Sequence, residues 1–125
     1  MSTKDIMRLC DQVREIAYAI HLYHGCGYLE KVYENALVHR LQKAGFQVQQ
    51  QKPIKIHDED GTVIGDYYAD IIVNGSLLIE LKTCKTLSGE HAAQVLHYLK
   101  ATHIEHALLV NFGSYKFEIK KMVLN

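Results

Sequence analysis

The spacing of apolar residues changes at Gly45, and this change restricts the fold more than any other feature of the sequence. Before Gly45, apolar residues recur every three or four positions over 4–23 and over about 29–44. This spacing predicts two amphipathic helices. Gly45 itself suits the position just past a helix end, where the backbone becomes left-handed. After Gly45 the apolar residues alternate with a period of two, which is typical of strands.

The rest of the chain predicts three strands, a helix and two more strands. FQVQQQKPIKI, TVIGDYYADIIV and LLIELKTC are the first three strands, and Pro53 indicates a sheet edge or a bulge in the first. EHAAQVLHYLKAT is the helix, with Ser88 as a candidate N-cap, and HALLVNF and YKFEIKKMVL are the last strands. We therefore expect one α/β domain over 1–125, of order ααβββαββ, with a mixed central sheet flanked by helices.

The composition limits the class of protein. Lys plus Arg and Asp plus Glu each number 14, so the formal net charge is zero. A strong non-specific nucleic-acid binder is normally basic, although a neutral chain can still hold a local basic groove. The three cysteines do not suggest a disulfide framework, and the opening segment lacks the apolar stretch of a signal peptide. No apolar run is long enough to span a membrane, so we expect a cytoplasmic protein.

The third predicted strand contains Glu80-Leu81-Lys82, in which Glu80 and Lys82 point to the same face. The preceding strand places Asp70 inside an apolar run, where an unpaired carboxylate is costly to bury. A metal ion would offset that cost. Two carboxylates and the carbonyl of Leu81 suit Mg²⁺ or Mn²⁺, and a neighbouring lysine can orient water and offset charge. These residues predict a metal-dependent phosphodiesterase site, whereas an E-x-K segment alone is usually a solvated strand face.

Two helices offer further candidates. Gln94 and Tyr98 lie four residues apart and share a helix face, so they can line the site. The alternative is that Tyr98 is a core residue and Gln94 a surface residue. Glu30 and Glu34 are also four apart, and their mutual repulsion is easier to explain if one of them faces a cation. For Glu34, a solvated helix face is an equally good interpretation.

The turn between the second and third strands decides whether this site can form. A two-residue Asn74-Gly75 turn would pair Asp70 with Ile79, and Asp70 and Glu80 would then face opposite sides of the sheet. The site therefore requires a turn of odd length, such as one that includes Ser76, or a β-bulge.

The segment GYLEKVYE, from Gly27 to Glu34, resembles the signature of the small GxxExxY proteins, which are similar to the PD-(D/E)XK nuclease superfamily. YYAD, IELK, HAAQVLHYL and LLVNFG follow in the expected order, so the resemblance covers roughly 8–120. It implies a restriction-endonuclease-like core. It also implies metal ligation by Asp70 and Glu80, a catalytic role for Lys82, and supporting roles for Glu30, Gln94 and Tyr98.

We therefore expect a Mg²⁺- or Mn²⁺-dependent nuclease that hydrolyses phosphodiester bonds in nucleic acid, and DNA rather than RNA is the expected partner. Glu30 would complete the acidic, metal-binding cluster. The zero net charge suggests a domain that forms a homodimer or takes its nucleic-acid affinity from a partner protein. Two alternatives stay open. One is a non-catalytic binding or assembly module that retains the nuclease fold, and the other is a hydrolase of small phosphate esters with a closed pocket.

Overall fold

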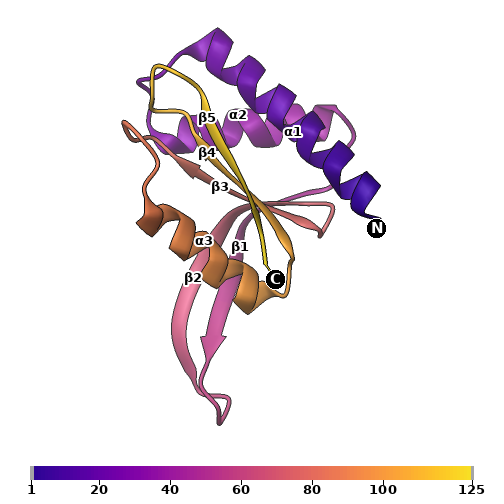
Figure 1. Cartoon of the computed structure of the whole chain (residues 1–125), viewed down its shortest axis with the longest axis vertical. Helices are drawn as coiled ribbons and strands as arrows, with labels where there is room; N and C mark the ends of the chain where they lie inside the picture. The colour runs from indigo at the N-terminus through magenta and orange to yellow at the C-terminus, as the bar shows by residue number, and fades with distance from the viewer. Residues whose placement is uncertain (1, 125) are drawn as a thin grey trace.

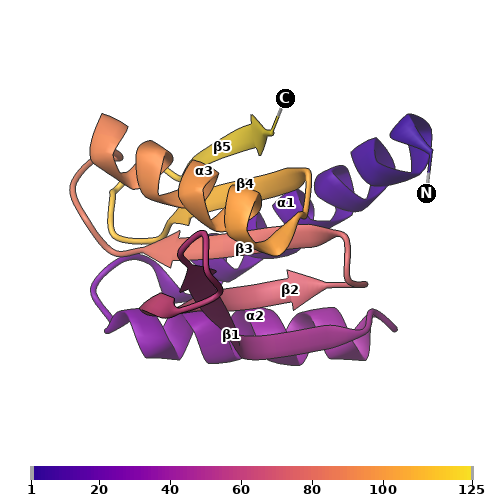
Figure 2. The same cartoon turned by 90° about the horizontal axis from the view of Figure 1, so that it is seen from below.

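The computed structural model describes residues 2–124 and contains a five-stranded mixed sheet between two layers of helices (Figures 1 and 2). The elements are α1 (Thr3–His24), α2 (Glu30–Lys43), β1 (Val48–His57), β2 (Val63–Val73), β3 (Leu77–Lys82), α3 (Gly89–Thr102), β4 (His106–Asn111) and β5 (Glu118–Val123). This order confirms the α/β class and the expected succession of helices and strands.

The strands follow one another across the sheet in the order β1-β2-β3-β4-β5. All neighbours are antiparallel except β3 and β4, which are parallel because α3 carries the chain back between them. Pro53 lies in β1, an edge strand of the sheet, as its missing N–H requires. Both faces of β3 are covered, since its residues Leu77–Leu81 are all buried.

The two faces of the sheet have separate cores. α1 and α2 pack on one face, where Val13, Ile20 and Leu37 meet strand residues such as Ile79 and Val110. α3 packs on the other face, where its buried residues meet β2, β3 and β4 through Val95, Leu99, Ile72, Leu78 and Leu109. Each fully buried aliphatic side chain contributes about 1.5–3 kcal/mol, so these layers hold the sheet in a fixed position between the helices.

The helix ends follow the expected chemistry. Ser2 caps α1 and Ser88 caps α3, each through a side-chain oxygen that accepts a backbone N–H of the first turn. At α3, the side chain of His91 in turn accepts the backbone N–H of Ser88 and so completes a capping box. Gly45, just past α2, has a φ of 94°, a left-handed conformation that suits glycine.

The β1–β2 hairpin extends well beyond the sheet. β1 and β2 pair from Val48–Val73 to His57–Val63, whereas β2 pairs with β3 only over Ile71–Val73. Residues 52–68 therefore form a two-stranded arm that projects from the body of the molecule (Figure 1). The point where β2 leaves β3, at Asp70, is called the fork below.

Candidate active site at the fork

The turn between β2 and β3 has three residues, Asn74, Gly75 and Ser76. It connects the pairs Val73–Leu77, Ile72–Leu78 and Ile71–Ile79, and continuing that register places Asp70 opposite Glu80. Asn74 and Gly75 have φ values of 53° and 66°, and both residue types tolerate this left-handed backbone. The expectation of an odd-length turn that includes Ser76 is confirmed.

Asp70 and Glu80 are joined through the backbone of both strands. The N–H of Asp70 donates to Glu80 Oε1 at 2.9 Å, and the N–H of Leu81 donates to Asp70 Oδ2 at 2.9 Å. A carboxylate oxygen has two lone pairs, so both groups keep acceptor capacity for a further ligand. The structure thus brings the two predicted carboxylates together at the fork.

The backbone of Leu81 faces the same point. Its N–H is directed at Asp70, and the N–H and C=O of one strand residue point to the same side of the strand. The carbonyl of the next residue, Lys82, faces β4 instead, where it accepts the N–H of Phe112 at 2.9 Å. The Leu81 carbonyl is therefore directed into the fork, and its role as a metal ligand stays a prediction.

α3 brings polar groups to the Lys82 side of the fork. Lys82 Nζ donates to Gln94 Oε1 at 3.4 Å. Tyr98 is only 7% exposed, and its ring lies 5.7 Å from that of Tyr67. Burial raises the pKa of Tyr98, and the nearby Glu80 carboxylate raises it further. Tyr98 is thus a core residue that also borders the site.

α2 contributes two glutamates from the opposite side. Glu30 lies in the first turn of α2, where burial and then the charge of Asp70 raise its pKa. Glu34 is 3% exposed, so the solvated alternative for Glu34 is wrong. Its carboxylate accepts hydrogen bonds from Lys31 Nζ at 2.8 Å, from Gln51 Nε2 at 2.8 Å and from the side chain of Gln50.

Gln51 is a site residue that the sequence did not reveal. Its φ of 54° is left-handed, and it makes no ladder pair although its neighbours Gln50 and Lys52 both pair with β2. The side chain donates to Glu34 Oε1 at 2.8 Å and to Asp70 Oδ1 at 3.2 Å. The only signal was a run of polar glutamines at the start of a strand. A strained backbone held at such a point is typical of functional sites.

The carboxylates at the fork share a low-dielectric environment. Burial raises the pKa of Asp70, with the Glu34 carboxylate adding to the shift. Burial and then the charge of Asp70 raise the pKa of Glu80 to about 8. Lys82 opposes these shifts, since its positive charge lowers the pKa of Asp70, Glu80 and Glu30. The surplus of carboxylates over lysine makes this an electrostatic environment that favours a divalent cation.

The donor set fits Mg²⁺ or Mn²⁺. Within residues 2–124, no three His, Cys, Asp or Glu side chains are arranged as a metal-binding group. Two carboxylates and a backbone carbonyl therefore form the candidate set here. Mg²⁺ retains several waters and usually binds through one or two carboxylates, so such a set meets its needs. The assignment of Asp70, Glu80 and the Leu81 carbonyl as ligands remains a prediction, whereas Glu30, the fourth predicted ligand, does not form a three-carboxylate group with Asp70 and Glu80 in the described residues.

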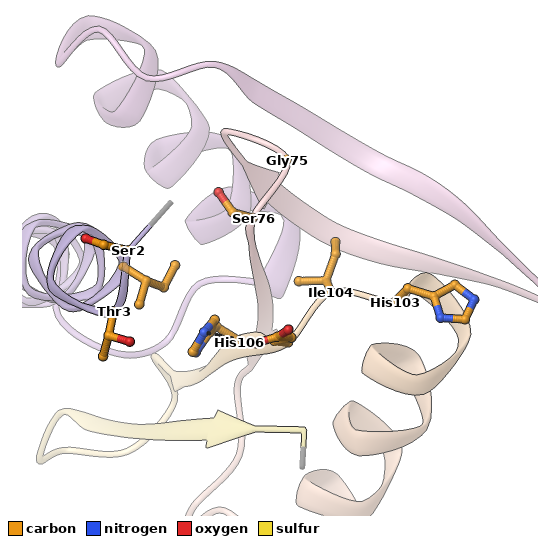
Figure 3. Close-up of a pocket in the computed structure, with 9 residues that line it drawn as sticks. Ser2, Thr3, Gly75, Ser76, His103, Ile104 and His106 are labelled. Carbon is orange, nitrogen blue, oxygen red and sulfur yellow. Dashed lines mark ion pairs between the residues drawn. The ribbon is translucent and has the colours of Figure 1, made fainter.

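A separate hollow of about 290 Å³ lies at the amino ends of β3 and β4, away from the fork. Its lining includes Ser2, Gly75, Ser76 and His106, which the close-up draws around the start of α1 (Figure 3). The Ser2 hydroxyl already accepts the N–H of Asp5. None of the predicted site residues lies in this hollow, so the fork is the stronger candidate.

The fold and the fork together define a restriction-endonuclease-like protein with an acidic site and one lysine. A family model of the PD-(D/E)XK nuclease superfamily matches residues 7–122, and the chain belongs to that superfamily. The crystal structure of SSO0001 has a similar fold, with a TM-score of 0.61 and 22% sequence identity over 94% of this chain. This chain matches 60% of the length of SSO0001. No curated protein matches the sequence.

Cys10, Cys26 and Cys84 are all free cysteines. Among the described residues, no helix is both long and apolar enough to cross a membrane.

Proposed function

We propose that this protein is a Mg²⁺- or Mn²⁺-dependent nuclease that hydrolyses phosphodiester bonds in nucleic acid, with DNA as the expected substrate. The observation that carries the proposal is the pairing of Asp70 and Glu80 across the fork, with Lys82 on the face of Glu80. Membership of the nuclease superfamily supports a nucleic-acid substrate.

The residues of the fork have separate roles in this proposal. Asp70, Glu80 and the carbonyl of Leu81 would hold the metal, and Glu30 would add negative charge beside them. When bound, such a metal supplies Lewis acidity and lowers the pKa of a bound water. Lys82 positions the attacking water and offsets the negative charge that develops on the phosphate.

α3 supports the lysine. Gln94 accepts a hydrogen bond from Lys82 Nζ at 3.4 Å and so limits the positions that the ammonium group can take. Tyr98, mostly buried beside Glu80, lowers the local dielectric constant on the α3 side of the site. A site of lower dielectric strengthens the electrostatic interactions between these groups and a phosphate.

Within the superfamily, we assign the chain to the GxxExxY proteins through Gly27, Glu30 and Tyr33. Gly27 has a φ of 132°, which residues with a side chain rarely adopt. The Tyr33 hydroxyl donates to the carbonyl of Gly25 at 2.6 Å and accepts the N–H of Tyr28 at 3.2 Å. These contacts hold the loop that leads directly into Glu30, which gives each motif residue a physical role.

Metal binding and cleavage should be measured on the same variants. We expect calorimetry to detect Mn²⁺ binding by the wild type, and Asp70→Asn to abolish both binding and DNA cleavage. Lys82→Ala should still bind Mn²⁺ but should cleave about 10²–10³-fold more slowly, since it removes one charge-stabilising group. Lys85→Ala, an exposed lysine three residues away, is the matched control and should behave as the wild type.

Two outcomes would contradict the proposal. Equal cleavage by the wild type and Lys82→Ala would place the activity elsewhere. A wild type that neither binds Mn²⁺ nor cleaves nucleic acid at millimolar metal would instead support a non-catalytic module with the nuclease fold.

A further inference from the structure

We propose that the groove between α3 and the arm binds backbone phosphates of a DNA strand beside the phosphate that is cleaved. The identity of the ligand rests on the proposed function, but the groove itself is defined by the structure alone. In Figure 1, α3 runs beside the base of the arm, and α3 makes close contacts with β1.

The groove consists of two adjoining hollows. The inner one, of about 500 Å³, is lined by residues that include Tyr67, Gln94 and Tyr98, with Glu90 as its one carboxylate. The outer one, of about 460 Å³, continues toward the end of α3. Ile56 from the arm and His97 from α3 line both hollows, so the two lie next to each other along α3.

The inner end of the groove lies beside the candidate active site. Gln94, which lines the inner hollow, accepts the hydrogen bond from Lys82. The outer end reaches His103, which follows α3. Nine residues of helix from Gln94 span about 13 Å. The groove therefore has room for more than one phosphate of a strand.

The outer hollow is lined by basic side chains and by no acidic ones. The chain has equal numbers of acidic and basic residues, yet the titratable side chains that line this hollow are all lysine or histidine. They are Lys55, His57, His97, Lys100 and His103. No carboxylate lines it, which is the lining expected for an anionic backbone rather than for a metal or a cationic ligand.

Lys100 is the strongest phosphate candidate among them. Lys55 is paired with Asp66 at 3.3 Å on the exposed surface of the arm, so its charge is partly compensated. Lys100 is exposed and makes no ion pair within the described part of the chain. His103 adopts a left-handed φ of 61° after α3, and its ring points away from Ser2 and His106 (Figure 3).

Lys100 also lies in the last turn of α3, where any cation interacts favourably with the helix dipole. That interaction alone would explain a lysine at this position without any ligand. Lys43 offers a direct comparison, because it is an exposed lysine in the last turn of α2 and does not line the groove. Both lysines interact with a helix dipole in the same way. A larger effect of substituting Lys100 than Lys43 on DNA binding would therefore come from a phosphate contact.

The test measures DNA binding by fluorescence anisotropy in a Lys82→Ala background with Mg²⁺, so that the strand stays intact. The probes are single-stranded and duplex DNA of about 20 nucleotides, several times the length of the groove. Lys100→Gln should weaken binding about 5–10-fold near 0.1 M salt and reduce the slope of log K against log salt by about one. Lys43→Gln should change neither quantity, and thermal unfolding should show that both variants fold.

Three results would overturn the proposal: no DNA binding, no change in the salt slope for Lys100→Gln, or an equal loss for Lys43→Gln. His97→Gln is a second groove variant and should weaken binding in the same direction. These outcomes are separate from the nuclease proposal. DNA cleavage that is normal in the wild type, together with unchanged binding in Lys100→Gln, rejects the groove alone. DNA binding through Lys100 without any cleavage rejects the nuclease alone.

Discussion

Asp70 and Glu80 are each hydrogen-bonded to the backbone of the other's strand. The Asp70 N–H reaches Glu80 Oε1 at 2.9 Å, and Asp70 Oδ2 accepts the N–H of Leu81, the residue after Glu80, at 2.9 Å. Two carboxylates that repel each other are thereby held side by side by backbone groups, which cannot rotate away. The site is preorganised for a cation before any cation binds.

Metal-free protein should lose stability as the pH rises toward 8, because of Glu80. Its pKa is about 8 in the folded protein, compared with an ordinary value of 4.5. Between these values the folded state binds more protons than the unfolded state, so the free energy of unfolding falls as the pH rises. Urea denaturation from about pH 5 to pH 8.5 should show this fall in the wild type and a smaller fall in Glu80→Gln.

Mn²⁺ should restore the stability that the wild type loses at high pH, because a ligand that binds only the folded state stabilises it. Glu80→Gln should gain less from the metal. Parallel stability curves for the two proteins without metal would show that the Glu80 carboxyl does not titrate as described.

Glu34→Ala should lower both the stability of the protein and its affinity for Mn²⁺, although Glu34 is not a predicted metal ligand. Its removal takes away the acceptor for Gln51 Nε2, which also donates to Asp70 Oδ1 at 3.2 Å. We expect a loss of about 1–3 kcal/mol in the free energy of unfolding, as for other buried groups that lose a partner. Mn²⁺ affinity, measured by calorimetry, should fall as well.

The control for Glu34→Ala is Asn35→Ala. Asn35 is exposed and shares the donor Gln50, whose Nε2 lies 2.9 Å from Asn35 Oδ1. A surface change of this kind should alter stability by less than about 0.5 kcal/mol and leave Mn²⁺ affinity intact. An equal effect of the two substitutions would exclude a specific role for the Glu34–Gln51–Asp70 contacts.

Gly113→Ala should disturb the segment that follows Lys82. A Cβ at Gly113 would lie 2.4 Å from the carbonyl carbon of Thr83 and 2.5 Å from the nitrogen of Cys84, both backbone atoms that cannot simply rotate away. Overpacking of this kind costs about 1–3 kcal/mol or more. We expect a lower melting temperature and, because the chain beside Lys82 must move, slower cleavage.

Gly89→Ala provides the comparison for Gly113→Ala. Gly89 begins α3, and no atom lies within 4 Å of a Cβ placed there. Alanine should be neutral or slightly stabilising at this position, since it favours the helix and restricts the unfolded chain. A melting temperature that falls equally in both variants would contradict the steric explanation.

Much of the fold could be predicted from local patterns. The change of period at Gly45 separated the helices from the strands, because periodicity depends only on which residues of one element share a face. The observed bounds differ from the expected ones mainly at strand ends, as in LLIELKTC, where β3 ends at Lys82. Strand ends depend on where a neighbouring strand stops pairing, which no single segment encodes.

The site was only partly predictable. Asp70, Glu80 and Lys82 stood out because carboxylates and a lysine occurred on apolar strands, which is costly without a ligand. Glu34 and Gln51 did not stand out, since a glutamate on a helix and a glutamine in a strand are ordinary on a solvated surface. Their importance appears only when α2 packs over β1 and buries Glu34 against Gln51.

The sequence by itself determined the succession of helices and strands, the superfamily and the residues able to carry the chemistry, because these depend on local spacing and residue type. The tertiary structure alone decided that Asp70 meets Glu80. That contact needs a three-residue turn through Ser76 and a strand that leaves the sheet at Asp70. The physical reason is that a shift of one residue in register reverses the face of every side chain on a strand.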